Sequence, residues 1–136
     1  MTTPIDFVNA ARAYLGVPFK HQGRSSKSLD CAGLLICAAN DCGLATVDIS
    51  GYSRHPDGRQ LKFMLDEHCE SIIFKNANIG DIVLFTIEQH PQHLALLTDI
   101  GMIHAYLPVG RVVEHSIDDK WRRRVRAAYR LREFAQ

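Results

Sequence analysis

The chain has 136 residues, a length that suits one domain, and it is 46% hydrophobic and 23% charged. Its net charge of +1 gives no global reason to expect nucleic acid as a partner, although a basic run extends from Lys120 to Arg132. The N-terminus lacks the basic and apolar regions of a secretory signal, and no stretch approaches the ~20 apolar residues that cross a bilayer. We therefore expect one soluble domain over residues 1–136, made in the cytoplasm, with no membrane or nucleic-acid partner.

The cysteines form neither a metal motif nor a disulfide motif. Cys31, Cys37, Cys42 and Cys69 include no C-x-x-C pair, and a chain of this length needs no disulfides, so we expect free thiols. Structural zinc prefers closely paired ligands, which the sequence lacks. Neither a P-loop nor a glycine-rich dinucleotide motif occurs. The sequence thus predicts no metal site and no cofactor.

The first half of the chain has helical periodicity. A first helix is expected over residues 5–15 and an irregular loop over residues 17–29. A second helix, capped by Asp30 and closed by Gly43, is apolar nearly all round. It is therefore expected to be buried.

A third helix is expected after a loop over residues 43–58. It begins at Asp57 or Gly58, is amphipathic, and has Cys69 late in it. The residues that share its apolar face are Leu61, Leu65, His68 and Ile72.

Beyond Asn78 the apolar residues recur with the period of strands. Helices followed by an antiparallel meander indicate an α+β fold, with N-terminal helices packed on a C-terminal antiparallel sheet of about five strands. The expected strands are Ile79–Phe85, His93–Thr98, Met102–Leu107, Arg111–His115 and Arg124–Leu131.

The last of these strands has two contrasting faces. We interpret its arginine face as a solvated surface that discourages edge pairing, in preference to a docking site for an acidic partner. One face takes Val125, Ala127, Tyr129 and Leu131, and the other takes Arg124, Arg126, Ala128, Arg130 and Arg132.

Cys31 is the candidate nucleophile because it follows the expected helix cap at Asp30. The N–H groups and positive dipole end of a helix N-terminus are expected to lower the pKa of its thiol, and the same N–H groups can hold an oxyanion. Cys37, Cys42 and Cys69 are better interpreted as small core residues.

His93 and His104 are the candidate partners of this cysteine. A histidine in a buried strand needs hydrogen-bond partners, so two on adjacent strands are expected to serve each other. They face each other directly only if the turn is centred on Thr98 and Asp99, and Gly101 favours a later turn that a bulge would have to reconcile. His115, near a strand end, is interpreted as structural or exposed.

Several stretches, in the same order, resemble the NlpC family of bacterial and phage peptidases. Leu15–Gly23 is similar to the segment with G-T-P-Y that precedes the family's nucleophile, and Leu29–Leu34 to its D-C-S-G-L motif. Ile79–Phe85 resembles the family's G-D-L-V-F strand, Gln92–Ala95 its base strand, and Ile103–Ala105 its third catalytic position. The ending, from Val112 to Arg130, is most similar to the branch found in phage and prophage tails.

The resemblance implies a papain-like NlpC fold and a cysteine endopeptidase. Cys31 would be the nucleophile, His93 the base and His104 its orienting partner. Peptidoglycan stem peptides would be the substrate, cleaved at the bond from γ-D-glutamate to diaminopimelate or lysine. Phage tail proteins would be further partners, and the enzyme would stay in the cytoplasm until it is assembled into a tail or released to the cell wall.

The expected substrate-binding residues are Asp30, Phe19, His21 and Ala32. Phe19 stands where the family has tyrosine, and Ala32 where it has serine. Two alternatives remain open: a catalytically weak tail or wall-binding module on the same fold, and an acyltransferase or amidase with another substrate.

Overall fold

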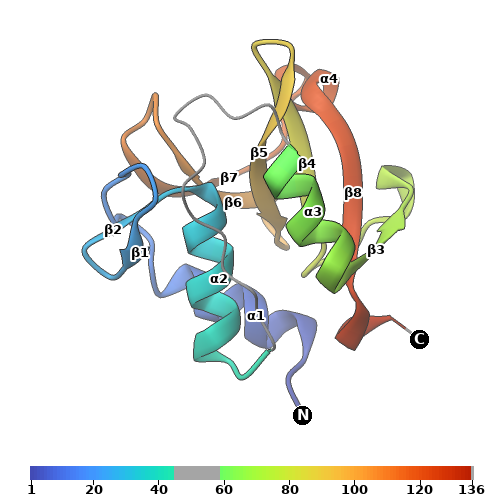
Figure 1. Ribbon diagram of the computed structural model, residues 1–136, viewed down its shortest axis with the longest axis horizontal. Coiled ribbons are helices and arrows are strands. Elements are labelled where there is room, and N and C mark those ends of the chain that lie inside the picture. The colour runs from blue at the N-terminus through green and yellow to red at the C-terminus, as the bar shows by residue number, and fades with distance from the viewer. Residues whose placement is uncertain (45–58, 136) are drawn as a thin grey trace.

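The computed structural model describes residues 1–44 and 59–135, and Figure 1 shows helices packed against a twisted sheet. The expected loop over residues 43–58 lies outside the described residues from residue 45 onward. The expected helix start at Asp57 or Gly58 lies outside them as well. The helices are α1 (Pro4–Arg12), α2 (Cys31–Asp41), α3 (Arg59–His68) and the short α4 (Asp119–Arg124), with 3-10 turns η1 (Phe74–Asn76) and η2 (Arg132–Phe134).

The main sheet is antiparallel and has six strands among the described residues, one more than expected. Its order is β3 (Cys69–Ile72), β8 (Val125–Leu131), β4 (Ile82–Ile87), β5 (His90–Leu97), β6 (Met102–Tyr106) and β7 (Arg111–His115). A separate two-stranded ribbon joins β1 (Arg24–Ser25) to β2 (Ser28–Leu29) inside the segment that was expected to be an irregular loop. The α+β class is confirmed.

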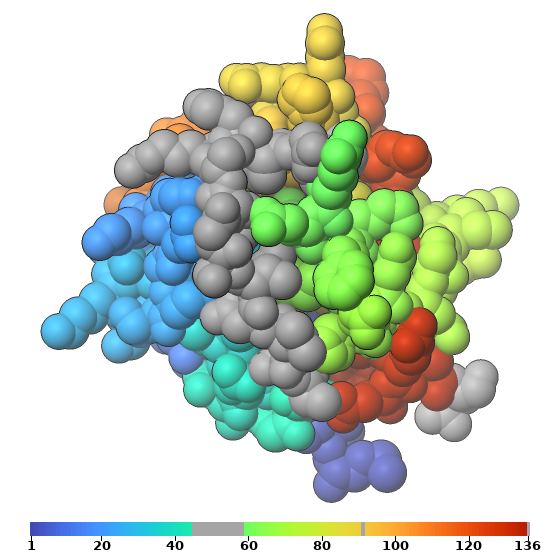
Figure 2. All heavy atoms as spheres, in the orientation of Figure 1, coloured from blue at the N-terminus to red at the C-terminus, as the bar shows by residue number. Residues whose placement is uncertain are grey.

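The strands bury both faces because successive side chains point to opposite sides. On one face, Ile82, Leu84 and Leu94 join the main core with residues of α1, α2 and α3. On the other face, Val83 and Phe85 pack under Trp121 of α4. Figure 2 shows α4 beside the tip of the β4–β5 hairpin. A helical layer therefore covers one face, and Trp121, with partly buried neighbours that include Phe74 and Tyr106, covers the other.

The third helix is shorter than its periodicity predicted. It ends at His68, and the chain continues as β3, in which Cys69 pairs with Leu131 and Ile72 with Ala128. The helical placement of Cys69 and Ile72 was wrong, because pairing with β8 satisfies the backbone hydrogen bonds of this segment and overrides its helical pattern.

The interpretation of the β8 arginine face as a solvated surface that discourages edge pairing was correct only in part: Arg126 and Arg132 are exposed, but β8 is not an edge strand. β8 lies between β3 and β4, so it has no free edge. Ala128, assigned to the arginine face, is 1% exposed, and Arg130 forms an ion pair with the buried Asp81, with Nη2 2.8 Å from Oδ2. Arg124 belongs to α4, which Asp118 caps by accepting a hydrogen bond from Trp121 N–H.

Candidate active site

Asp30 caps the N-terminus of α2 and also binds the loop that precedes this helix. Its Oδ1 accepts hydrogen bonds from Gly33 N–H and from Arg24 Nη1, both at 2.8 Å, and its Oδ2 accepts one from Gln22 N–H at 2.8 Å. The residue is 4% exposed. A capping carboxylate with these partners fixes both the helix end and the loop that approaches it.

Gly33 is needed for this close approach. A Cβ at Gly33 would lie 2.1 Å from the carbonyl oxygen of Gly23 and 2.9 Å from Arg24 Nη1. The loop therefore rests directly on the first turn of α2, and the glycine two positions after Cys31 is what leaves room for it.

The thiol of Cys31 lies against the backbone of β5. Its Sγ is 4.0 Å from the carbonyl oxygen of Gln92, to which it donates, and Leu94 N–H also contacts the sulfur. These two residues flank His93 in the sequence. Among the described residues, the thiol of Cys31 donates its hydrogen bond to Gln92. The thiol proton is therefore not donated to His93 in this structure.

The sequence predicted a lowered pKa for Cys31, and the structure contradicts this. Burial raises the pKa of the Cys31 thiol to about 12, and the negative charge of Asp30 adds to the rise. The backbone N–H groups of Leu94 and Ala32 and the cation of Arg24 oppose it without cancelling it. Desolvation thus outweighs the helix N-terminus, and the resting thiol is neutral.

His93 and His104 form the expected pair. Nε2 of His93 lies 2.7 Å from Nδ1 of His104, and the two residues are 6% and 0% exposed. The β5–β6 register pairs Leu96 with Ile103 and Leu97 with Met102, which places the two histidines diagonally on one face of the sheet. The turn is later than Thr98, as Gly101 suggested, and the two side chains meet across the strands as diagonal neighbours.

A third histidine continues this pair, and the sequence interpretation missed it. Nε2 of His104 lies 2.8 Å from Nε2 of the half-buried His115, and Nδ1 of His115 lies 2.8 Å from the carbonyl oxygen of Ser116. β6 pairs Met102 with His115 and His104 with Val113, so His104 and His115 are again diagonal neighbours. Alternation along β7 was the signal that could have found it.

Aromatic rings enclose the three histidines. The Trp121 ring lies 5.8 Å from His93, 5.1 Å from His104 and 6.2 Å from His115, measured between centroids. Tyr106 stacks on His104 at 5.2 Å. Burial lowers the pKa of both His93 and His104; the Arg124 cation lowers the pKa of His93 further, and the neighbouring histidines that of His104. The paired rings are therefore neutral near pH 7.

Of the expected substrate-binding residues, Asp30 and Ala32 lie at the start of α2, and Phe19 and His21 lie in the loop that precedes the β1–β2 ribbon. Phe19 is half-buried against the main core, and its N–H donates to the carbonyl oxygen of Gly110 at 2.8 Å. Ala32 is 1% exposed. Nε2 of His21 lies 3.2 Å from Nε2 of Gln22. The remaining cysteines are free; Cys37 and Cys42 are half-buried, and Cys69 is buried.

Residues 1–44 and 59–135 contain no group of three histidine, cysteine or acidic side chains that could hold a metal ion. They also contain no helix long and apolar enough to cross a membrane.

The structure thus combines a cysteine at the start of a buried helix with an antiparallel sheet that carries paired histidines, in an α+β fold. The model of the NlpC/P60 family matches residues 16–130. The chain therefore belongs to the NlpC/P60 family. A search of curated proteins found no match.

Solved structures share this fold. An NlpC/P60 family protein from Bacillus cereus ATCC 10987 has a TM-score of 0.74 and 20% identity over 96% of this chain and 40% of its own. The NlpC/P60 domain of the peptidoglycan hydrolase SagA has a TM-score of 0.69 and 22% identity over 93% and 97%. The peptidoglycan hydrolase RipB from Mycobacterium tuberculosis has a TM-score of 0.69 and 18% identity over 98% and 65%. The chain thus spans well under half of the first of these proteins.

Proposed function

We propose that this protein is a cysteine endopeptidase that hydrolyses peptidoglycan stem peptides. One observation carries the proposal. The sulfur of Cys31 contacts the backbone of Gln92 and Leu94, the two residues next to His93 in the sequence, and the His93 ring is hydrogen-bonded to His104. A nucleophile, a base and a group that orients the base are the parts that acyl transfer needs.

The reaction starts from a neutral thiol. As Sγ of Cys31 attacks the scissile carbonyl carbon, His93 takes the thiol proton through Nδ1, because its Nε2 is bound to His104. His93 then gives that proton to the leaving amine as the C–N bond breaks. Water hydrolyses the thioester, and a proton returns to the sulfur. N–H groups at the start of α2 stabilise the oxyanion.

The substrate proposal is supported by family membership and by the descriptions of SagA and RipB as peptidoglycan hydrolases. We propose the bond from γ-D-glutamate to diaminopimelate or lysine as the scissile bond, with Phe19 and His21 facing the substrate and the buried Ala32 next to Cys31 at the start of α2. Asp30 would act mainly by holding Arg24 and the loop, since its carboxylate is buried and already accepts three hydrogen bonds. Delivery by a phage or prophage tail, or release to the wall, belongs to the same proposal.

The neutral thiol also favours a second candidate. A chain whose cysteine has a raised pKa, and which has phenylalanine and alanine at positions 19 and 32, fits a wall-binding module with weak activity. An acyltransferase or amidase with another substrate would use the same three residues.

The test is an assay of the purified protein on defined stem-peptide fragments, with product masses. A γ-D-glutamyl product that disappears in Cys31→Ala and persists in Cys37→Ala supports the endopeptidase. Binding without turnover in the wild type would support the module, and a product that carries a new acyl group would support the transferase.

A further inference from the structure

A chain of hydrogen bonds runs from a backbone carbonyl to the proposed catalytic base. It begins at the carbonyl oxygen of Ser116 and passes through His115 and His104 to His93, with links of 2.8, 2.8 and 2.7 Å. Each link joins two atoms that can bond only if one donates and the other accepts. The direction of the first link therefore fixes all the others.

That first link has only one possible direction. A carbonyl oxygen only accepts, so Nδ1 of His115 must hold a proton and donate it to Ser116. In a neutral His115, Nε2 is then the acceptor, and His104 must donate to it from Nε2. Nδ1 of His104 is then the acceptor, and His93 must donate from Nε2.

The last step determines the chemistry of the base. A neutral His93 with its proton on Nε2 has an unprotonated Nδ1, and no hydrogen bond reaches this nitrogen from the residues that the structure describes. If the chain ran the other way, Nδ1 of His93 would carry the proton and could accept none from a thiol. The direction set at Ser116 thus decides whether His93 can act as a base.

We infer that His115 is a positioning residue that, with the carbonyl group of Ser116, selects the tautomers of His104 and His93. The tautomer assignment stands on geometry alone, and its effect on turnover rests on the proposed function.

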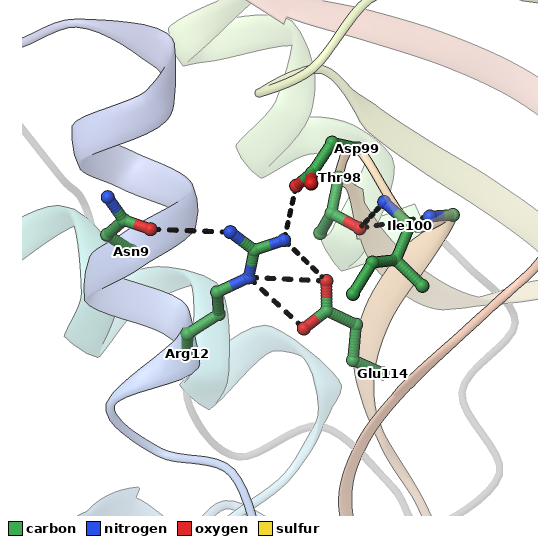
Figure 3. Close-up of polar contacts among 7 residues, drawn as sticks. Asn9, Arg12, Thr98, Asp99, Ile100 and Glu114 are labelled. Atoms are coloured by element: carbon green, nitrogen blue, oxygen red, sulfur yellow. Dashed lines mark hydrogen bonds and ion pairs between the residues drawn. The ribbon is translucent and has the colours of Figure 1, made fainter.

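His115 itself is held from two sides. A Cβ at Gly101, in the β5–β6 turn, would lie 2.3 Å from the carbonyl oxygen of His115, so this turn packs directly on its backbone. On the other face of β7, Glu114 accepts hydrogen bonds from Arg12 of α1, with Nη2 2.8 Å from Oε2, and Arg12 also pairs with Asp99 (Figure 3). These contacts of Arg12 tie the β5–β6 turn and β7 to α1. They therefore hold the backbone at His115, the residue that follows Glu114.

The assignment can be read without any variant. In protein labelled with ¹⁵N-histidine, at about pH 8, where an ordinary histidine is neutral, long-range ¹H–¹⁵N spectra report which ring nitrogen is protonated. We expect the proton on Nδ1 in His115 and on Nε2 in His104 and His93. A proton on Nε2 of His115 in the wild type would overturn the inference.

Two substitutions then test the control that His115 exerts. His115→Phe keeps a ring for packing and removes the acceptor, so some His93 should become protonated on Nδ1 and kcat should fall about tenfold with KM little changed. His115→Gln keeps an acceptor oxygen and should retain more of both. His90→Gln, at the exposed start of β5, is the matched control.

The outcomes separate the two proposals. If His93 keeps its tautomer in folded His115→Phe, or if the Phe and Gln variants lose kcat equally, His115 does not act by directing the chain. If the tautomers shift as expected but the wild type cleaves no stem peptide, the proposed function fails while the tautomer assignment stands.

Discussion

The rings of His104 and Trp121 meet edge to face, with centroids 5.1 Å apart and an interplanar angle of 87°. Trp121 is 7% exposed and also lies near His93, so one indole separates the paired histidines from water on this face of the sheet. The depressed pKa of each ring depends on this burial.

Trp121→Leu should therefore raise the pKa of both His93 and His104 towards the ordinary value of about 6.5, because water reaches the rings. It should also lower the free energy of unfolding by about 2–3 kcal/mol. NMR titration of the imidazoles and chemical denaturation measure the two effects. Phe7→Leu, in the core on the opposite face of the sheet, is the control: it should cost stability and leave both titrations unchanged.

Mild acid should destabilise the fold through the same pair. The folded pKa of His93 and of His104 lies below the unfolded value of about 6.5, so below that pH the unfolded chain binds more protons. Stability should be fully present above pH ~6.5 and should fall as the pH drops, by up to about 1.4 kcal/mol per pH unit for each ring.

Urea denaturation at several values between about pH 6.5 and 5 tests this, because few carboxylates titrate in that window. His104→Gln should remove roughly half of the slope, and His90→Gln should leave it intact. A slope that is the same in His104→Gln as in the wild type would show that the pair does not titrate as described.

Alkylation of Cys31 should show that its thiol is neutral at rest. Because burial raises its pKa to about 12, its reaction with iodoacetamide in the native protein should be slow at pH 7 and should increase up to the highest pH at which the fold persists. Mass spectrometry of labelled peptides separates Cys31 from the other three thiols. A rate that reaches a plateau below pH 7 would indicate a preformed thiolate and would contradict the neutral resting state.

Gly33→Ala should disrupt the site while the rest of the fold remains. Its Cβ would lie 2.1 Å from the carbonyl oxygen of Gly23, so the loop must move away from α2. We expect a loss of about 1–3 kcal/mol of stability and a fall in turnover. Gly16→Ala is the matched glycine control: its φ of +87° makes it strained by about 1–2 kcal/mol, but no atom lies within 4 Å of its Cβ. Equal turnover in both variants would contradict a role for the loop.

Local sequence signals were sufficient to place Cys31 at the start of a helix and to pair His93 with His104, because a helix cap and two buried strands can be recognised from neighbouring residues. They were insufficient where tertiary structure decides. His115 meets His104 only through the register of β6 and β7, and Trp121 reaches the rings only because α4 folds over the sheet. The pKa of Cys31 was misjudged for the same reason: the helix N-terminus is visible in the sequence, and the desolvation that outweighs it is not.

Phe19 and Ala32 are the two positions at which the chain departs from the pattern it resembles. Phe19→Tyr adds a hydroxyl to a half-buried ring, and a hydrogen-bond donor that stabilises a transition state is worth about 2.7–4 kcal/mol. If the site has only lost this donor, the variant should raise kcat on a γ-D-glutamyl-diaminopimelate peptide. Ala32 is 1% exposed, so Ala32→Ser buries a hydroxyl and should cost about 1–3 kcal/mol of stability unless substrate binding supplies a partner.

Two accounts can be separated by steady-state kinetics: a depleted site, which has only lost hydrogen-bonding groups, and a changed site, which is adapted to another substrate. The kinetics compare Phe19→Tyr, Ala32→Ser and the double variant on stem peptides with free and with blocked amino ends. In a depleted site, Phe19→Tyr raises kcat on both peptides, and Ala32→Ser lowers KM for the free amino end alone, because only that end offers the hydroxyl a partner. In a changed site, the added hydroxyls are buried without partners, and both variants bind and turn over the peptides more weakly than the wild type. Unchanged or reduced activity in all three variants would therefore contradict the depleted-site account and would favour a different substrate or the wall-binding module.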